Sequence, residues 1–216
     1  DRGGNGVEHH DGWLYVARND SVVRYDLRDG AIPTAPPQTI VRDLPATPDH
    51  NAKTVVVTDD GRMLVNIGSA SNACQVENRV PFSPGIDPCP ELDERAGIWE
   101  FSATEPDQGP ADGTRIATGV RNANALDIDP VTGQLYAAVN GRDQLYENWP
   151  DRFSPAQDRT TPAEELLRVE RGADYGWPYC YFDAALGRRV LAPEYGGDGT
   201  EQGRCAGLPD PAVTFP

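Results

Sequence analysis

The sequence repeats one short pattern three times, and this repetition limits the fold more than any other feature. Each copy consists of an apolar run, a polar turn that ends in glycine, and a second apolar run. The turns are Asp11-Gly12, Asp60-Gly61 and Thr132-Gly133. These dipeptides supply the positive φ that a tight hairpin turn needs. The pattern therefore predicts three antiparallel hairpins.

Each hairpin continues into further strand-like segments. A third strand is predicted at residues 21–26, 97–103 and 165–170, and the first two copies add a fourth at 38–44 and 114–118. Four antiparallel strands per unit is the plan of a β-propeller blade. We therefore predict an all-β fold in which the chain forms one partial β-propeller domain with about three four-stranded blades.

The predicted blades span roughly residues 5–45, 50–118 and 120–181, and the start of a further blade follows to residue 216. A propeller needs at least four blades to close. Three blades would leave two raw faces and exposed strand edges. The sequence is therefore interpreted as a fragment of a longer polypeptide, and residues 211–216 as a strand that is just starting.

Composition agrees with a fold rich in strands and turns. The chain has 22 glycines and 20 prolines, together 42 of its 216 residues, which favours many turns and few long helices. Residues 161–168 are the best helix candidate, and we interpret them as a short turn that leads into a strand. The run Val55–Val57 does not alternate, which suits an inner strand covered on both faces.

The net charge of −15 excludes some classes of partner. Nucleic-acid binding needs lysine and arginine to neutralise phosphates, and an acidic surface is also repelled by anionic membranes. No run approaches the ~18 apolar residues of a membrane span. The expected partners are therefore small molecules, and the acidic surface is compatible with cation binding.

Four cysteines, at positions 74, 89, 180 and 205, fall into two local pairs without a CxxC motif. Zinc fingers need tighter spacing, so a zinc site is not expected. Of the three possible pairings we favour Cys74–Cys89 and Cys180–Cys205, because each closes a loop that lacks its own core. Such disulfides indicate a periplasmic or secreted protein. The alternative is four free buried thiols in a cytosolic protein.

His50 and Arg121 are the candidate catalytic residues. His50 precedes the first strand of the second unit, and Arg121-Asn122 occupies the same place in the third. Equivalent positions of neighbouring blades converge at the central channel of a propeller, so these side chains should face one pocket. Histidine exchanges a proton near neutral pH, which makes His50 a candidate general base. The alternatives are a solvated loop histidine and an arginine in a structural ion pair.

Two further motifs have two interpretations each. Asn140-Gly141-Arg142-Asp143 ends the second strand of the third unit, where glycine would let backbone carbonyls approach a ligand or a hard cation. The same motif is also a common turn. The aromatic turn Tyr175-Gly176-Trp177 is more typical of core packing than of a binding site.

Taken in order, these motifs resemble one family. They are His50-Asn51, Asp60-Gly61, Ile67-Gly68-Ser69, Arg121-Asn122, Asn140 to Asp143, and Asp174-Tyr175-Gly176-Trp177-Pro178. The set is similar to the soluble quinoprotein glucose/sorbosone dehydrogenases, closest to the sorbosone dehydrogenase branch, from about residue 6 to residue 181. The resemblance implies a six-bladed β-propeller that holds pyrroloquinoline quinone and calcium near its axis.

The same resemblance implies a chemistry and a set of residue roles. An aldose or sorbosone-type sugar is oxidised and the electrons pass to an external acceptor. His50 is the general base, Arg121 polarises the quinone oxygen, and Asn122 positions the cofactor. The backbone carbonyls of Gly141 and Arg142 are the calcium ligands.

The sequence departs from this family in two places. The glucose-specific members carry an aspartate that orients the histidine, and here that position is Ser69. The family's basic residues that bind the cofactor carboxylates would lie beyond Pro216. Two alternative functions stay open. One is a calcium-dependent lactone hydrolase that recruits Asn51, Asn122, Asn124 and Asp143, and the other is a non-catalytic propeller that binds a partner.

Overall fold

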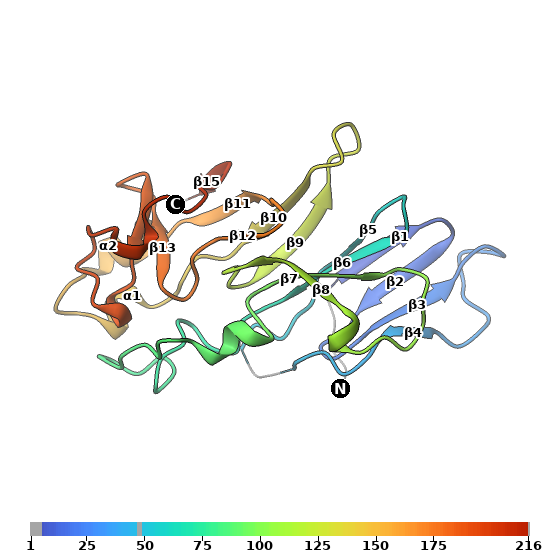
Figure 1. Cartoon of the computed structure of the whole chain (residues 1–216), viewed down its shortest axis with the longest axis horizontal. Coiled ribbons are helices and arrows are strands. Elements are labelled where there is room, and N and C mark those ends of the chain that lie inside the picture. The colour runs from blue at the N-terminus through green and yellow to red at the C-terminus, as the bar shows by residue number, and fades with distance from the viewer. Residues whose placement is uncertain (1–5, 47–48, 216) are drawn as a thin grey trace.

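The computed structural model describes residues 6–46 and 49–215, and its main elements are three antiparallel sheets (Figure 1). The first sheet is a meander of β1 (Gly6–His10), β2 (Trp13–Ala17), β3 (Val22–Asp26) and β4 (Gln38–Val41). The second contains β5 (Val55–Val57), β6 (Arg62–Ile67), β7 (Gly97–Ser102) and β8 (Thr114–Thr118), with the short β12 (Ala173–Asp174) parallel to β8.

The third sheet takes its strands from distant parts of the chain. It is formed by β9 (Ala123–Ile128), β10 (Leu135–Val139), β11 (Glu164–Arg168) and β15 (Val213–Phe215). A separate hairpin of β13 (Cys180–Asp183) and β14 (Arg188–Leu191) lies beyond it. The helices are short: α1 (Leu145–Asn148), α2 (Pro155–Thr160), η1 (Pro90–Asp93), η2 (Pro110–Asp112), η3 (Pro193–Tyr195) and η4 (Gly203–Cys205).

The predicted all-β class and all three hairpins are confirmed. Each turn glycine has the positive φ that its hairpin requires: 74° at Gly12, 80° at Gly61 and 71° at Gly133. Val55–Val57 is buried along its whole length, as the lack of alternation indicated. The strand after residue 161 also forms, because α2 ends at Thr160 and β11 begins at Glu164.

The end of the chain differs from the prediction. Residues 211–216 were expected to start a further blade, but β15 pairs antiparallel with β11, and Leu166 faces Val213. The third sheet therefore receives its fourth strand from the far end of the chain, after the β13–β14 hairpin. This pairing joins segments far apart in sequence, so no local pattern could reveal it.

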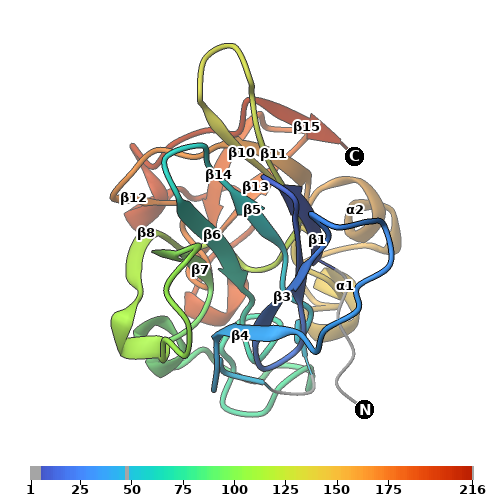
Figure 2. The same ribbon diagram turned by 90° about the vertical axis from the view of Figure 1, so that its right-hand side faces the viewer.

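The sheets pack through their apolar faces. One buried cluster, which includes Tyr15, Val65 and Trp99, lies between the first and second sheets. A second, which includes Ile98 and Leu167, lies between the second and third. The first strands of the sheets lie side by side, since β5 contacts both β1 and β9, and Figure 2 shows β5 beside β1. The segments that lead into β5 and β9 converge, because Thr54 donates a hydrogen bond to the Ala123 carbonyl.

Both favoured disulfides are present, Cys74–Cys89 and Cys180–Cys205, so the alternative of four free thiols was wrong. The first closes most of an insertion, residues 71–95, that connects β6 to β7. Trp177 packs against this disulfide with an exposed fraction of 5%, which confirms that the aromatic turn belongs to the core. In the described part of the chain, no helix is long and apolar enough to cross a bilayer.

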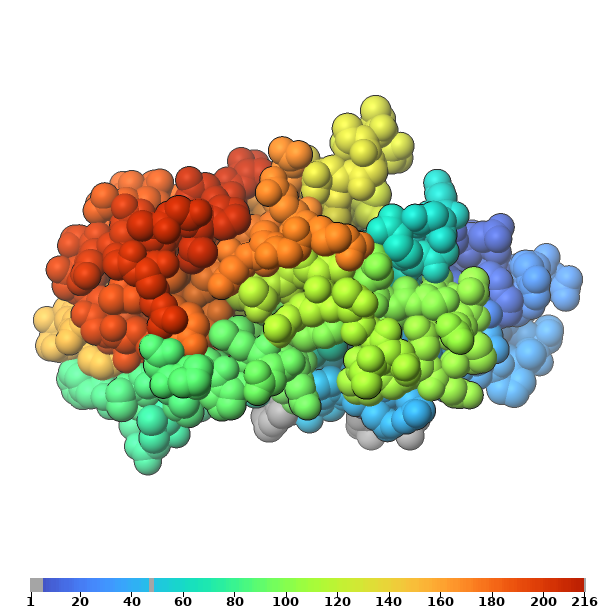
Figure 3. Space-filling model, in the orientation of Figure 1, coloured from blue at the N-terminus to red at the C-terminus, as the bar shows by residue number. Residues whose placement is uncertain are grey.

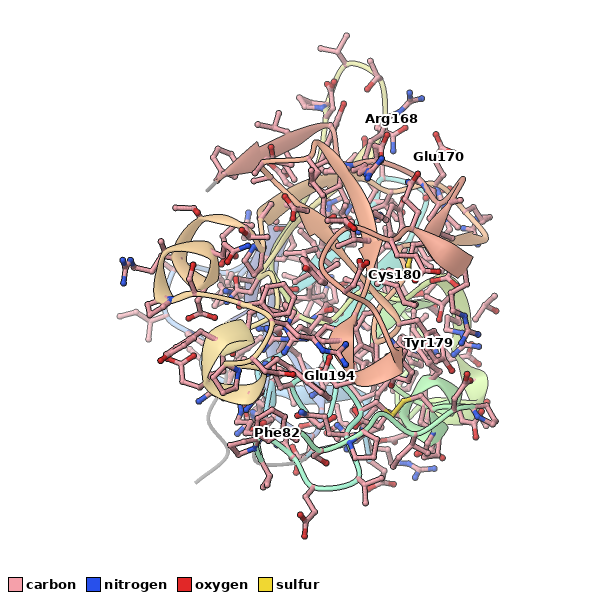
Figure 4. The ribbon with its side chains drawn as sticks, turned by 90° about the vertical axis from the view of Figure 1, so that its left-hand side faces the viewer. Phe82, Arg168, Glu170, Tyr179, Cys180 and Glu194 are labelled. Carbon is pink, nitrogen blue, oxygen red and sulfur yellow. A yellow bond between two sulfur atoms is a disulfide. The ribbon has the colours of Figure 1, made fainter. Side chains whose placement is uncertain are left out.

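A buried ion pair fastens this insertion to the C-terminal segment. Glu194, in η3, accepts hydrogen bonds from both terminal nitrogens of Arg142, at 2.6 and 3.0 Å, and from Trp149 Nε1 at 2.9 Å. Gln75 of the insertion donates to the same carboxylate at 3.3 Å. Figure 4 shows Glu194 beside α1 and near Phe82 of the insertion, and Figure 3 shows the insertion lying along the C-terminal segment.

Replacing Glu194 with alanine is expected to destabilise the protein by about 3–5 kcal/mol, because the Arg142 charge would stay buried without a partner. The side chains of Arg142 and Glu194 are 4% and 0% exposed, so water cannot compensate. The change is measured as a lower urea midpoint with an unchanged m-value. Arg204→Ala, which breaks the half-exposed pair with Asp87, is the matched control and should move the midpoint little. An unchanged midpoint for Glu194→Ala would contradict the prediction.

Candidate active site

His50 lies at the entrance to β5, as predicted, and is held in an unusual backbone conformation. Its φ is +44°, in the left-handed region that residues other than glycine rarely adopt. Strain of this kind persists only where the surroundings impose it, and it gathers at functional sites. Here the half-buried ring is fixed by Ser69, whose Oγ lies 2.8 Å from Nδ1.

The hydrogen bonds of Ser69 determine which histidine nitrogen carries the proton. The Ser69 hydroxyl has one hydrogen, which it donates to the Ser71 carbonyl at 2.7 Å. Ser69 Oγ must therefore accept from His50, which places the proton on Nδ1. No described residue donates a hydrogen bond to the other nitrogen, Nε2, so its lone pair is available. This is the tautomer that a general base needs.

Burial and, second, the nearby positive charge of Arg121 together lower the pKa of His50 to about 4, although Asp49 and Asp143 oppose the shift. At neutral pH the imidazole is therefore uncharged and ready to accept a proton. Ser69 is fully buried and offers no negative charge. The imidazolium that forms after proton transfer thus lacks the carboxylate partner that an aspartate would provide.

The loop around Ser69 is anchored by the insertion. Glu91, in η1, accepts hydrogen bonds from the backbone N–H groups of Ala70 and Ser71, at 2.6 and 3.2 Å, and from the Ser71 hydroxyl. The Ser69 N–H donates to the Arg121 carbonyl at 2.8 Å. The segment that orients His50 is therefore tied to the segment that carries Arg121.

Arg121 is 4% exposed, and most of its hydrogen-bonding capacity is used within the protein. Nε donates to the Asn72 carbonyl, Nη1 to the Gly141 carbonyl, and Nη2 to Asn72 Oδ1 and Asp143 Oδ2, at 2.7–3.1 Å. A guanidinium has five N–H groups. Partners among the described residues therefore account for four, and one N–H on Nη1 is left for a ligand.

Asn122, next to Arg121, presents a hydrogen-bond acceptor. Its Nδ2 donates to Asn124 Oδ1 at 3.1 Å, and Asn124 in turn donates to Asn140 at 2.6 Å. This chain of amides fixes the orientation of Asn122. Its Oδ1 is buried and has no partner in the described part of the protein. A buried acceptor without a partner costs free energy unless a ligand satisfies it.

Gly68 is the point where His50 and Asn122 converge. A Cβ at this position would lie 2.8 Å from the His50 Cβ and 3.1 Å from Asn122 Oδ1. A Cβ essentially never lies as close as 2.8 Å to such an atom, and Asn122 would also have to move slightly, so glycine lets both residues approach the strand end. These contacts place His50 close to Asn122, and the Ser69 N–H links the partner of His50 to the Arg121 carbonyl. Among the described residues, no hydrogen bond joins His50 directly to Arg121.

The two backbone carbonyls that were predicted to bind calcium, those of Gly141 and Arg142, differ in their hydrogen bonds. The Gly141 carbonyl accepts the hydrogen bond from Arg121, whereas the Arg142 carbonyl accepts none from a described residue. The Arg142 side chain points to Glu194 and holds this segment in place. A carbonyl oxygen has two lone pairs, so Gly141 retains one acceptor position.

Asp143 and Arg79 also belong to the site, and neither was predicted to bind the quinone. Asp143 Oδ2 lies 2.7 Å from Arg121 Nη2 and 3.1 Å from Arg79 Nη2. Arg79 in addition bonds Asp49, the residue before His50. Burial raises the pKa of Asp143, but the two arginines outweigh burial and leave it below its ordinary value. Arg79 lies in the insertion, for which the first unit has only a short connection between β2 and β3.

The fold and the site define an all-β protein in which a neutral histidine and a buried arginine meet at the beginnings of two neighbouring first strands. The chain belongs to the TrAA12-like family, which matches residues 3–185. A comparison with curated proteins finds no match.

Solved structures share the fold. An iodide structure of a Trichoderma reesei carbohydrate-active enzyme of family AA12 has a TM-score of 0.72 at 19% identity, over 98% of this chain and 55% of that one. The holo form of the pyranose dehydrogenase PQQ domain from Coprinopsis cinerea has 0.72 at 18%, over 97% and 54%. The apo form of the soluble aldose sugar dehydrogenase from Escherichia coli has 0.51 at 17%, over 95% and 51%. The chain thus spans about half the length of these proteins.

Proposed function

We propose that this chain carries half of the active site of a sugar dehydrogenase that uses pyrroloquinoline quinone. The observation that carries the proposal is His50 fixed with its proton on Nδ1, beside the buried guanidinium of Arg121. The similarity to a pyranose dehydrogenase PQQ domain and to an aldose sugar dehydrogenase supports it. The substrate class is an aldose, and the sorbosone-type sugar is the narrower possibility within it.

The proposed architecture is a partial β-propeller. Three sheets, each with four antiparallel strands and the second extended by the parallel β12, pack with their first strands side by side and support this arrangement. In the whole protein we expect six blades. Further polypeptide would supply the blades that pack against the outer faces of the first and third sheets. The length of the solved relatives, about twice that of this chain, is consistent with that number.

The residues present fit the quinone. Its oxygen atoms need hydrogen-bond donors and a positive charge, which the remaining N–H of Arg121 provides. The unpartnered Asn122 Oδ1 is a buried polar atom that a bound group or its associated cation would satisfy. Arg121 and Asn122 would therefore hold the quinone from this side, and further basic residues for its carboxylates are expected outside this chain.

The hydroxyl proton and the hydride of the sugar go to two different acceptors. His50 Nε2 takes the proton of the sugar hydroxyl as its carbon becomes a carbonyl. The bound quinone supplies the acceptor for the hydride that leaves the same carbon. Arg121 would stabilise the negative charge that develops as the hydride is accepted, because its guanidinium is preorganised by Asn72 and Asp143 and shielded from water. The electrons then pass to an external acceptor.

Calcium is the proposed accompanying cation. Hard cations bind backbone carbonyl oxygens, and the Arg142 carbonyl together with the second lone pair of Gly141 offers two such ligands. The Asp143 carboxylate nearby offsets the positive charge of Arg121. Removing calcium from the intact protein with a chelator should therefore weaken quinone binding. The two disulfides support export to the periplasm or the exterior.

The other interpretations have less support. A calcium-dependent lactone hydrolase would need Asp143 as a metal ligand, but this carboxylate is shared by two guanidinium groups. A non-catalytic binding module gives no reason for a fixed histidine tautomer. The proposed function is tested by incubating the intact protein with the quinone and Ca²⁺ and measuring dye reduction with a panel of aldoses. Absence of both quinone binding and dye reduction would refute it.

Ser69→Asp is expected to move the acid limb of the rate profile to higher pH. A carboxylate next to Nδ1 stabilises the imidazolium and raises the pKa of His50 above its present value of about 4. Because His50 acts as a base, the rate falls once the pH drops below this pKa. With a higher pKa, the rate therefore begins to fall at a higher pH. The pH dependence of kcat/KM measures the shift. Ser69→Ala adds no charge and is the control. If the acid limb of the kcat/KM profile lies at the same pH in Ser69→Asp and in wild type, the expectation is contradicted.

A further inference from the structure

We propose that Asn72 is a positioning residue that holds the guanidinium of Arg121 in place for the chemistry at the quinone; this inference rests on the proposed function. Asn72 lies in the insertion of residues 71–95 and is completely buried. A buried polar side chain is retained only where its hydrogen bonds are satisfied. The partners of Asn72 are the residues of the candidate site.

Asn72 contacts two edges of the Arg121 guanidinium. Its backbone carbonyl accepts from Nε at 3.1 Å, and its side-chain Oδ1 accepts from Nη2 at 2.9 Å. Two acceptors from one residue match the fixed fork of arginine and define the plane of the group. Asn72 therefore receives two of the four N–H groups of Arg121 that have partners.

The same side chain fixes the backbone of Asp143, the other partner of Nη2. Asn72 Nδ2 donates to the Asp143 carbonyl at 2.8 Å, and Asn72 Oδ1 accepts from the Asp143 N–H at 3.2 Å. Only one orientation of the amide satisfies these bonds and the bond to Arg121. Asn72 thus joins Arg121 and Asp143 into one rigid unit, in which Asp143 Oδ2 completes the set at 2.7 Å.

Asn72 is itself held by the core of the insertion. Trp177 Nε1 donates to its carbonyl at 2.9 Å, and its N–H donates to Asn78 Oδ1 at 3.0 Å. The Cys74–Cys89 disulfide begins two residues later and packs against Trp177. The position of Arg121 is therefore set by the disulfide-closed insertion as well as by the segment that leads into β9.

The Asn72 side chain restricts how the Arg121 guanidinium can move. With Asn72 in place, the one Arg121 N–H without a described partner lies on Nη1. Without the Asn72 side chain, Nη2 keeps only Asp143, and the backbone of Asp143 loses two hydrogen bonds. The guanidinium keeps its bonds to the Asn72 and Gly141 carbonyls but loses the rigid support of Asp143, so it can shift, and a displacement of about 1 Å can cost on the order of 10²-fold in rate.

A double-mutant cycle in the intact protein tests this inference. Asn72→Ala, Arg121→Ala and the combined variant are reconstituted with quinone and Ca²⁺, and kcat and the quinone dissociation constant are measured. We expect Asn72→Ala to lower kcat about 10–100-fold in the wild-type background and less than about twofold in Arg121→Ala, because Asn72 acts through Arg121. Quinone affinity should show the same non-additivity.

A purely structural role for Asn72 gives a different result. Its loss would then lower kcat and quinone affinity equally in both backgrounds, which would overturn the inference. Asn148→Ala removes another buried asparagine that makes no contact with Arg121, and should keep wild-type kcat. If the wild-type protein binds no quinone and reduces no dye, the proposed function fails first. If it does both but the cycle is additive, only the inference about Asn72 fails.

Discussion

His50→Asn is expected to lower kcat by about 10³-fold while the affinity for quinone stays within about threefold, because general bases contribute on the order of 10²–10⁴ to rates. The substitution removes the Nε2 lone pair that takes the hydroxyl proton. Asparagine is preferred to alanine as the replacement because it tolerates the left-handed backbone at this position, where φ is +44°. The loss can therefore be assigned to the base and not to strain.

The controls for His50→Asn separate catalysis from folding. His9→Asn changes an exposed histidine at the far end of β1 and should keep wild-type kcat. Stability should also change in a defined direction. Between the ordinary pKa of 6.5 and the folded value of about 4, the unfolded chain binds a proton that native His50 does not, so acidification through this window destabilises wild type. His50→Asn should lose part of that acid sensitivity. Wild-type dye reduction by His50→Asn would exclude His50 as the base.

The hairpins could be predicted because their information is local. An Asp-Gly or Thr-Gly turn between two apolar runs specifies both the turn type and the pairing of its strands. The pairing of β15 with β11 and of β12 with β8 depends on chain segments that meet only after folding. The helix α2 was missed although its signal was present. Ser154 and Gln157 form a capping box around Pro155 at the first helical position.

The central site residues could be predicted from positional equivalence. His50 and Arg121 precede the first strands of successive units, so a repeating architecture brings them together. Asn72 and Arg79 lie in the long connection between β6 and β7, outside the repeated strand pattern, so positional equivalence assigned no role to either. Nothing in the sequence marks Asn72 as different from the other asparagines, since half of its contacts with Arg121 use its backbone carbonyl.

The substitution of Ser69 for aspartate gains a physical meaning only from the structure. The sequence indicates a weaker partner for His50. The bond from Ser69 to the Ser71 carbonyl adds that the serine still fixes the tautomer. Ser69 therefore keeps the orienting function of a carboxylate and omits its charge, which is consistent with the low pKa of His50.

Arg121→Lys is expected to lower kcat by about 10²-fold, and Arg121→Met by about 10³-fold, since removing a donor to a developing negative charge costs on the order of 10²–10³. The acceptors around Arg121 are Asn72, Gly141 and Asp143, and they are arranged for a planar fork. A lysine ammonium is a point charge that cannot reach all three at once. The measurement is kcat with saturating quinone, so that weaker binding does not enter the comparison.

The pH dependence of kcat/KM separates the effect of the Arg121 charge from the effect of its geometry. Arg121 is the second cause, after burial, of the low pKa of His50. Arg121→Met removes this positive charge, so the pKa of His50 should rise and the acid limb of kcat/KM should move to higher pH. Arg121→Lys keeps the charge, so its limb should stay near that of wild type even though kcat falls. If both variants shift the limb equally, the charge of Arg121 does not act on His50, and the proposed pairing of base and cation in one pocket is wrong.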